Sequence, residues 1–361
     1  MNQKFIPNAN RLAALRHPAE QNMVVTAVRQ VSNTMRTYTL RSAEGKELAY
    51  FEAGSYIPVY LDIDGNRIER PYSLSSSPKQ AEDGFYEISV KAISGGYVSQ
   101  FILDNWKEGT HVRLGAPYPG ECYNPVRDSK QVIALAGGSG ITGFYSLAQA
   151  MCDGDVAIEK LTVFYGVNTE AELMGSEAWT ALEEKSGGMI RCIRVVANDQ
   201  SGKYEVGYIT LDMIRKYCDI EDASFFISGP EAMIRAMKGF LEPLGIKRRR
   251  IRVSMSGDSG YNAEAGSDEE VTLTVHMASE TYTIPAKKSE TVLAALNRNA
   301  LNPAARCRSG KCGFCRAMVI CGEYTLAEDE TGVRKMDKQL GFIHPCCSRP
   351  TTDMELVVQR G

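Results

Sequence analysis

The spacing of the cysteines near the C-terminus constrains this chain more than any other feature. Cys307, Cys312 and Cys315 follow the pattern C-x4-C-x2-C in the segment CRSGKCGFC. Cys346 follows after a gap long enough to cross a small domain. Four thiolates at this spacing bind a [2Fe–2S] cluster, whereas structural zinc sites usually pair their ligands in close C-x2-C knuckles. The pattern predicts a cluster held by these four cysteines, with a zinc site or buried free thiols as the alternatives.

Length and composition place the chain among ordinary globular proteins. Its 361 residues, 43% hydrophobic and 24% charged, suit two or three domains. A net charge of −3 provides no overall positive field for nucleic acid. No run of apolar residues is long enough for a membrane span, and no secretory signal is visible at the N-terminus. We therefore expect a cytoplasmic protein with reduced thiols.

Periodicity divides the chain into segments of different character. Residues 22–125 alternate apolar and polar positions between turn residues, which predicts an antiparallel β-barrel. Residues 126–254 alternate apolar strands with helix-length segments, which predicts a Rossmann-like α/β domain with a parallel sheet. Gly, Ser and acidic residues dominate the predicted linker, 255–270. The cysteine-rich domain follows as residues 271–361, and residues 1–21 form an N-terminal extension.

A glycine-rich turn follows the first apolar strand of the α/β segment, in LAGGSGITGF. Gly138, Gly140 and Gly143 match G-x-G-x-x-G, and Gly137 precedes them. Between a strand and a helix, such glycines let the backbone approach a dinucleotide pyrophosphate, whose charge the helix N-terminus stabilises. The later loop VNTEAEL contains no Lys or Arg for a 2′-phosphate, which favours NADH over NADPH.

The segment RPYSLSS at residues 70–76 resembles the R-x-Y-[ST] flavin motif of the ferredoxin–NADP reductase superfamily. Arg70 can donate a fork of hydrogen bonds to a flavin phosphate. Tyr72 can pack on the isoalloxazine ring, and Ser73 can form a hydrogen bond near its N5. The resemblance implies that these residues, with Pro71 between them, bind FAD; FMN is the alternative.

A second segment, ISGGYVSQFI, resembles the G-G-x-x-S pattern of the same superfamily. Gly95 and Gly96 precede a helix start at Val98 and Ser99. Backbone N–H groups at a helix start bind phosphate, so the resemblance implies that these four residues contact the flavin cofactor. N-capping of the helix is a second role for Ser99, compatible with the first.

Two further patterns of the superfamily concern the nicotinamide. G-G-S-G-I-T recurs here and implies that Thr142 lies near the ring. FFISGPEAM resembles C-G-P-x-x-M, which closes over the ring: Gly229 and Pro230 fit, and Ser228 stands where many relatives have Cys. The residues implied in hydride transfer are therefore Tyr72, Ser73, Thr142 and Ser228.

Together these motifs resemble, over residues 22–361, reductases with a C-terminal plant-type ferredoxin domain. Examples serve phenylacetyl-CoA epoxidase, ketosteroid hydroxylase, carnitine monooxygenase and hybrid cluster protein. The resemblance implies an FAD-binding barrel, an NAD-binding domain and a β-grasp ferredoxin domain. Because such a domain commonly ends in Cys, two residues and Arg-Pro, CCSRP implies that Cys346 is the ligand and Cys347 a packed thiol.

The resemblance implies electron transfer from NADH through FAD to a [2Fe–2S] cluster, and on to a partner oxygenase, hydroxylase or other redox enzyme. NADH delivers two electrons together as hydride and a cluster accepts one, so a flavin must stand between them. Two other functions remain open from the sequence. One is a stand-alone flavin reductase or NADH oxidase, and the other is a redox-sensing iron–sulfur binding protein.

Overall fold

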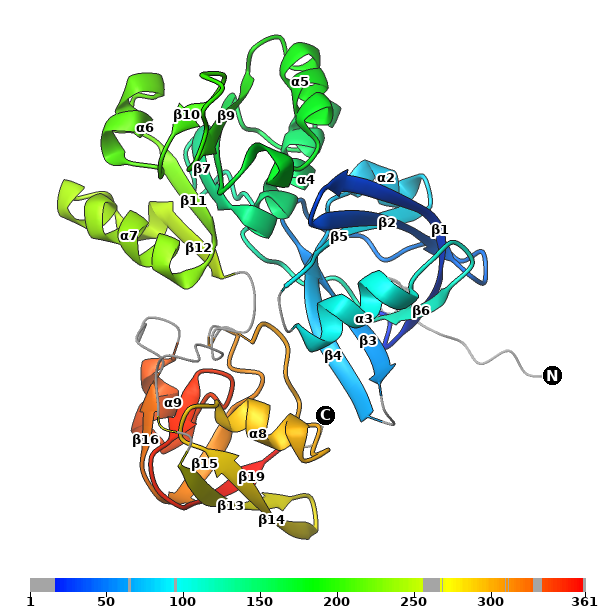
Figure 1. Ribbon diagram of the computed structural model, residues 1–361, viewed down its shortest axis with the longest axis vertical. Coiled ribbons are helices and arrows are strands. Elements are labelled where there is room, and N and C mark those ends of the chain that lie inside the picture. The colour runs from blue at the N-terminus through cyan, green and yellow to red at the C-terminus, as the bar shows by residue number, and fades with distance from the viewer. Residues whose placement is uncertain are drawn as a thin grey trace. The chain divides into compact units, whose positions relative to one another are not determined.

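The computed structural model describes residues 17–63, 66–93, 96–255, 267, 269–308, 310, 312–326 and 333–359 (Figure 1). Gly95 and most of the predicted extension and linker lie outside these residues, and the predicted domain boundaries stay predictions. The chain divides into two compact units. One comprises Met1–Val59 and Tyr72–Ser256, and the other comprises Tyr60–Pro71 and Gly257–Gly361.

The first six strands form one sheet in the order β4-β3-β6-β1-β2-β5. Their bounds are β1 Gln21–Ser32, β2 Met35–Ser42, β3 Tyr56–Ile63, β4 Asn66–Ser73, β5 Phe85–Lys91 and β6 His111–Leu114. Two short helices, α2 (Pro78–Glu82) and α3 (Tyr97–Asn105), flank β5 in sequence. A bridge between Leu74 and Ile88 joins the two edges of the sheet. The predicted antiparallel barrel is thereby confirmed.

The barrel core follows from the alternation of its strands. Tyr38 and Leu40 on β2, and Tyr86, Ile88 and Val90 on β5, are completely buried. Successive side chains of a strand point to opposite faces, so every second residue can fill the interior. The β2–β5 pairing sets Tyr38 opposite Ile88 and Leu40 opposite Tyr86, which gathers these side chains on one face.

The next six strands form a parallel sheet in the order β10-β9-β8-β7-β11-β12. They are β7 Gln131–Gly137, β8 Lys160–Val167, β9 Ile190–Val196, β10 Glu205–Val206, β11 Ser224–Gly229 and β12 Ile251–Met255. The sequence order reverses beside β7, because β8 lies on one side of it and β11 on the other. Ligands of doubly wound sheets bind at the carboxyl ends of the strands at such a point.

Helices cover both faces of this sheet, as Figure 1 shows. They are α4 Ile141–Asp153, α5 Ser176–Lys185, α6 Leu211–Tyr217 and α7 Glu231–Leu241. Side chains of α4 and α5 share one buried core with β7–β9, and those of α6 and α7 share another on the opposite face. Short 3-10 turns are η1 Gly138–Gly140, η2 Glu170–Glu172, η3 Glu242–Leu244 and η4 Arg248–Arg250. The predicted Rossmann-like domain is confirmed.

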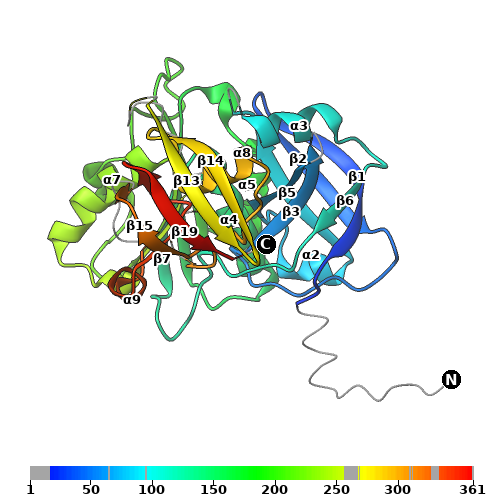
Figure 2. The ribbon, with the colours of Figure 1, turned by 90° about the horizontal axis from the view of Figure 1, so that it is seen from below.

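The second unit contains a mixed five-stranded sheet in the order β14-β13-β19-β15-β17 (Figure 2). Its strands are β13 Glu270–Met277, β14 Glu280–Lys287, β15 Ala317–Cys321, β17 Phe342–Ile343 and β19 Met354–Val358. A small sheet pairs β16 (Tyr324–Leu326) with β18 (Ser348–Pro350). Helices α8 (Val292–Arg298) and α9 (Lys335–Gln339) complete the unit, and α8 packs on the sheet through Val292, Ala295 and Leu296.

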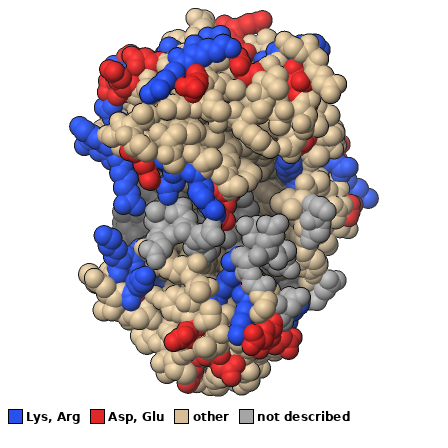
Figure 3. Space-filling view, turned by 60° about the vertical axis from the view of Figure 1, so that its left-hand side comes forward, with Lys and Arg blue, Asp and Glu red and all other residues tan. Residues whose placement is uncertain are grey.

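Two surface properties bear on function. Across the described residues no helix is long and apolar enough to cross a membrane. Lysine and arginine side chains are interspersed with aspartate and glutamate on the face drawn in Figure 3. This mixture agrees with the small net charge of −3.

Candidate functional site

The glycine-rich turn lies at the carboxyl ends of β7 and β11, where the strand order reverses. A Cβ on Gly140 would stand 2.5 Å from the Ser228 carbonyl carbon and closer still to its oxygen. A Cβ on Gly137 would stand 2.5 Å from the Met233 sulfur. Glycine is therefore required here by close packing of the turn against β11 and α7.

This turn leads directly into α4, a helix of 13 residues whose N-cap is Gly140. Gly138 has a φ of +53°, in the left-handed region that favours glycine. N–H groups at a helix start can bind a phosphate, although here the Ile141 N–H already donates to carbonyls of the preceding turn. Thr142 is buried, and its hydroxyl donates to the Ser139 carbonyl at 2.8 Å, which ties the first helical turn to the loop.

The second predicted nicotinamide segment meets the first. A Cβ on Gly229 would stand 3.1 Å from the Gly137 nitrogen, so the ends of β7 and β11 are in contact. Pro230 is the N-cap of α7, and Ser228 is half-buried at the end of β11. The structure therefore brings Gly137, Gly229, Pro230 and Ser228 together, although nearly a hundred residues separate the two motifs.

Lys91, at the end of β5, is a residue that sequence reasoning missed. Its ammonium lies 3.2 Å from the position of a Cβ on Gly138 and forms a 3.1 Å ion pair with Glu172. Both side chains are largely buried, at 25% and 14% exposure. A cation thus stands beside the turn predicted to bind a pyrophosphate. The only sequence signal was a lysine shortly before the G-G pair of the flavin motif.

The loop after β8 carries carboxylates, as its sequence indicates. Glu170 accepts a hydrogen bond from the Tyr204 hydroxyl at 2.7 Å. Lys203, from the segment between β9 and β10, approaches the same carboxylate at 3.9 Å. This lysine is a nearby cation that inspection of the loop alone did not reveal. The Glu170 carboxylate still lies just after the end of β8.

The flavin motif lies at the end of β4. Tyr72 is half-buried and Ser73 is exposed, while an Arg70 guanidinium nitrogen donates to the Glu69 carbonyl at 2.9 Å. Gly96 is the N-cap of α3, without a side-chain capping bond. Val98 and Ser99 are buried in the first turn of this helix.

The Ser99 hydroxyl is buried and has no hydrogen-bond partner among the described residues. Among the described residues, the Ser99 hydroxyl therefore does not cap α3. A Cβ on Gly96 would stand 2.5 Å from this oxygen, so any larger residue at position 96 would displace the Ser99 side chain. An unpaired buried hydroxyl costs free energy unless it finds a partner. This donor at a helix N-terminus fits a phosphate oxygen of a flavin cofactor.

The four cysteines of the C-terminal motif gather as two pairs. The Cys312 N–H donates to the Cys307 sulfur at 3.3 Å, and the Cys315 and Cys346 sulfurs are 3.5 Å apart. Two pairs of thiols suit the two irons of a [2Fe–2S] cluster, with two ligands to each iron.

Backbone donors surround these sulfurs. The Gly310 N–H donates to the Cys346 sulfur at 3.2 Å, and the Phe314 N–H donates to the Cys312 sulfur at 3.4 Å. Gly310 has a φ of +74°, which lets the loop turn its N–H inward. Hydrogen bonds to the sulfurs are one determinant of a cluster's potential.

Proximity of the thiols also changes their acidity. The hydrogen bond with Cys307, and then burial, raises the pKa of Cys312. The hydrogen bond with Cys346, and then burial, raises the pKa of Cys315. Each thiol therefore resists ionisation while its neighbour is present without a cation. Iron relieves this by stabilising the thiolates, so the donor set fits a cluster.

The adjacent Cys347 is buried in the same cluster as Cys315 and Cys346. Its sulfur donates to the His344 carbonyl at 3.4 Å. His344 is fully buried, with Nδ1 2.6 Å from the Gly310 carbonyl and Nε2 2.9 Å from the Asp337 carboxylate. The Asp337–His344 pair thus supports the loop from behind. Sequence reasoning did not identify this pair.

Three family models match the chain. They are the oxidoreductase FAD-binding domain over residues 22–123, the oxidoreductase NAD-binding domain over 134–239, and the 2Fe-2S iron-sulfur cluster binding domain over 275–351. The three matches follow one another along the chain in the order predicted from the motifs.

Relatives of similar length are reductase subunits. The glycine betaine monooxygenase reductase subunit of Pseudomonas aeruginosa is 26% identical over 349 residues, covering 91% of this chain and 93% of that protein. A putative toluene-4-sulfonate monooxygenase system reductase subunit of Comamonas testosteroni is 26% identical and covers 86% and 92%. The solved phthalate dioxygenase reductase has a TM-score of 0.69 at 20% identity, covering 94% and 98%, and shares the fold.

Proposed function

This chain belongs to the flavin-dependent oxidoreductases of the ferredoxin–NADP reductase superfamily that carry a C-terminal [2Fe–2S] domain. From this premise we propose that it supplies single electrons to a terminal oxygenase. NADH gives two electrons as hydride, a cluster takes one, and a flavin exchanges either number. The observation that carries the proposal is the gathering of two thiol pairs in a chain that also has FAD- and NAD-binding domains.

We assign the flavin to the end of β4 and the start of α3. Tyr72 and Ser73 would contact the isoalloxazine ring, and Arg70 its phosphate. Gly96 and Ser99 would bind the pyrophosphate, because the Ser99 hydroxyl is buried and unpaired among the described residues. A phosphate oxygen would supply the acceptor that this hydroxyl lacks.

NADH is assigned to the ends of β7 and β11. The turn from Gly137 to Gly140 would hold the pyrophosphate, with the N–H groups of the first turn of α4 pointing at it. Thr142, Gly229 and Pro230 would line the nicotinamide. Ser228 replaces the cysteine of many relatives. Its hydroxyl can form a hydrogen bond but is less polarisable than a cysteine sulfur.

NADH is preferred to NADPH on electrostatic grounds. Glu170 and Glu172 stand after β8, where the adenosine ribose lies in dinucleotide-binding folds. Carboxylates accept hydrogen bonds from the ribose 2′-hydroxyl and repel a 2′-phosphate. Lys203 lies within 3.9 Å of Glu170, and Lys91 forms a 3.1 Å ion pair with Glu172, so both cations moderate this repulsion.

The cluster is assigned to Cys307 and Cys312 on one iron and to Cys315 and Cys346 on the other. The paired geometry and the backbone donors support this assignment. The partner is assigned from the relatives, which are named as reductase subunits of two monooxygenase systems.

Cys315→Ser, compared with Cys347→Ser, tests the cluster as the electron exit. Ferricyanide can accept electrons from a reduced flavin, whereas cytochrome c serves as a one-electron acceptor for the cluster. We expect Cys315→Ser to retain NADH–ferricyanide activity and to lose most NADH–cytochrome c activity. The matched Cys347→Ser variant should retain both.

Equal cytochrome c activity in the wild type and Cys315→Ser would contradict the proposal. It would favour a stand-alone flavin reductase, because electrons would then leave from the flavin. Iron and acid-labile sulfide analysis of both variants confirms which of them holds the cluster.

A further inference from the structure

Three consecutive serines follow the flavin motif directly. Ser75, Ser76 and Ser77 begin two residues after Ser73, and all three are essentially completely buried. Ser77 caps α2, since its hydroxyl accepts from the Gln80 N–H. Buried serines in a row are unusual, because a hydroxyl loses its hydration unless the protein supplies partners.

The barrel holds this serine row from one side. The Glu87 N–H on β5 donates to the Ser76 hydroxyl at 3.0 Å, and the Ser75 N–H donates to the Glu87 carbonyl at 2.8 Å. The serines that follow β4 are therefore hydrogen-bonded to β5. They are fixed in the same sheet as the residues assigned to the flavin.

Helix α4 holds the same row from the other side. The Ser146 hydroxyl donates to the Ser76 carbonyl at 2.7 Å. The Gln149 amide donates to the Ser75 carbonyl at 2.6 Å. Further along, the Ser77 hydroxyl donates to the Asp153 carboxylate at 2.9 Å. Residues three and four apart share one face of a helix, so one stripe of α4 forms all three bonds.

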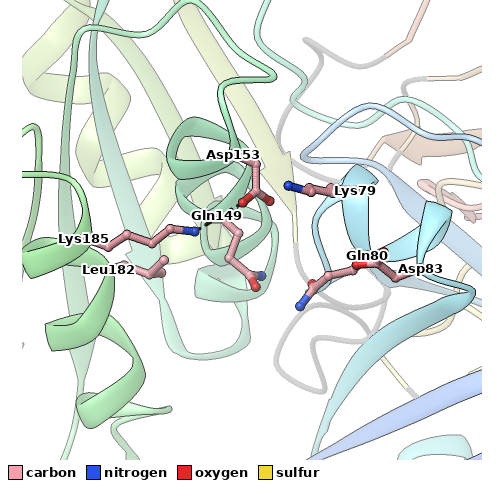
Figure 4. A pocket seen from close by; sticks show the side chains of 7 residues that line it. All are labelled: Lys79, Gln80, Asp83, Gln149, Asp153, Leu182 and Lys185. Carbon is pink, nitrogen blue, oxygen red and sulfur yellow. Dashed lines mark hydrogen bonds and ion pairs between the residues drawn. The ribbon is translucent and has the colours of Figure 1, made fainter.

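Asp153 closes the row at the surface. Its second oxygen lies 3.3 Å from the Lys185 ammonium on α5, as the dashed line in Figure 4 shows. Gln149 and Asp153 face a hollow of about 220 Å³ that is lined on its other side by α2 residues, including Lys79 and Gln80. Water therefore reaches the outer end of the row. The Ser146 end is completely buried.

The serine row follows the residues assigned to the flavin, and α4 follows the turn assigned to NADH. Ser75 is two residues from Ser73, about 7 Å along a strand. Ser146 is four residues from Thr142, about 6 Å along a helix. The hydrogen bonds of Ser146 and Gln149 therefore lie only a few residues along the chain from the residues assigned to the flavin and from those assigned to the nicotinamide.

We propose that Ser146, Gln149 and Asp153 are positioning residues that clamp α4 to the serine row and so set the distance between nicotinamide and flavin. The inference rests on the proposed hydride transfer from NADH to FAD. Hydride donor and acceptor must approach to about 3–3.5 Å, and a misplacement of about 1 Å costs on the order of 100-fold in rate. A hydrogen-bonded clamp near both sites limits such misplacement.

Ser146→Ala and Gln149→Leu, singly and together, test the clamp. Each removes one donor to a serine carbonyl and leaves every residue assigned to a cofactor unchanged. Tyr123→Phe is the matched control, because it removes a 3.1 Å side-chain bond to the Ala157 carbonyl that lies away from both cofactor assignments. Asp153→Asn keeps an acceptor for Ser77 and should retain most of the rate.

The measurement is the anaerobic stopped-flow rate of flavin reduction at saturating NADH, with NADH deuterated at the transferred position as a second substrate. We expect the double variant to be slower by about tenfold or more, with an NADH dissociation constant within about threefold of the wild type. The deuterium isotope effect should be at least as large as in the wild type, because hydride transfer itself is slowed.

A purely structural role predicts a different result. Misfolding lowers the amplitude of flavin reduction and the melting temperature, but it leaves the rate of the folded fraction unchanged. A wild-type rate in the double variant overturns the clamp. If the double variant does not fold, Gln149→Leu alone decides by the same criterion. Failure of NADH to reduce the wild-type flavin would instead refute the proposed function.

Discussion

Substitution of Gly140 by alanine should separate cofactor positioning from folding. The added Cβ would stand 2.5 Å from the Ser228 carbonyl carbon and 3.0 Å from the Gly229 nitrogen. Carbon atoms pack at about 3.5–4.0 Å, so one side must move by about 1 Å. Ser228 cannot move freely, because β11 is paired with β7 on one side and β12 on the other. The glycine turn must shift instead.

The magnitude follows from this shift. A displacement of about 1 Å at the nicotinamide turn should lower kcat/KM for NADH on the order of 100-fold. That loss corresponds to about 2.7 kcal/mol of transition-state stabilisation. The overpacked contact should also destabilise the nucleotide domain by about 1–3 kcal/mol. FAD and cluster content should remain normal, because Gly140 belongs to neither set of residues assigned to these groups.

Gly143 provides the matched control within the same motif. It lies inside α4, and a Cβ there would meet only the Gly54 Cα, at 4.0 Å. Alanine is favoured over glycine in a helix by about 1 kcal/mol. Gly143→Ala should therefore retain full activity and melt at the same or a higher temperature.

The assay is steady-state NADH–ferricyanide reduction, accompanied by a thermal melt of each variant. Gly140→Ala with kcat/KM close to the wild-type value would refute the packing argument. Equal impairment of both variants would refute it as well, because a Cβ meets close backbone atoms at position 140 but not at position 143.

Three further outcomes are expected. Ser99→Ala should raise the stability of flavin-free protein, because it removes an unpaired buried hydroxyl, and should weaken FAD binding by about tenfold or more, since a hydrogen bond to a charged group contributes about 1.5–3 kcal/mol; flavin fluorescence on dilution measures the affinity, and unchanged affinity would exclude the assigned contact. Glu170→Ala should raise kcat/KM for NADPH by about tenfold, because it removes a repelling carboxylate and releases Lys203; no gain would show that the ribose lies elsewhere. His344→Leu leaves the Gly310 carbonyl and the Asp337 carboxylate without their imidazole partner, costs about 2 kcal/mol, and should lower the temperature at which the cluster absorption bleaches; a wild-type midpoint would contradict this.

Local patterns in the sequence were sufficient for the folds of the domains. Period-two alternation predicted the barrel, and apolar strands followed by helices predicted the parallel sheet. A strand with one buried face alternates apolar and polar residues, and a strand with two buried faces is apolar throughout. The glycine-rich turn was also predicted from the sequence, because its pattern and the strand and helix on either side of it are close together in the chain. The glycines themselves were not equivalent, and only the structure shows that Gly140 is tightly packed and Gly143 is not.

Contacts between distant segments could not be read in this way. Ser75 and Gln149 are joined by a bond across the chain, yet no periodicity relates them. Lys91 reaches the nucleotide turn from the barrel for the same reason. In CCSRP only the family resemblance favoured Cys346 as the ligand, and the structure places its sulfur 3.5 Å from that of Cys315. Tertiary packing decides such questions, because it depends on strand order and loop conformation.

Anaerobic titration with NADH, followed by optical absorption and by electron paramagnetic resonance, tests most directly whether one chain carries electrons from nicotinamide through flavin to the cluster. We predict that NADH bleaches both the flavin and the cluster absorption and produces the resonance signal of a one-electron-reduced [2Fe–2S] cluster. Bleaching of the flavin alone, in protein whose cluster dithionite fully reduces, would contradict the account.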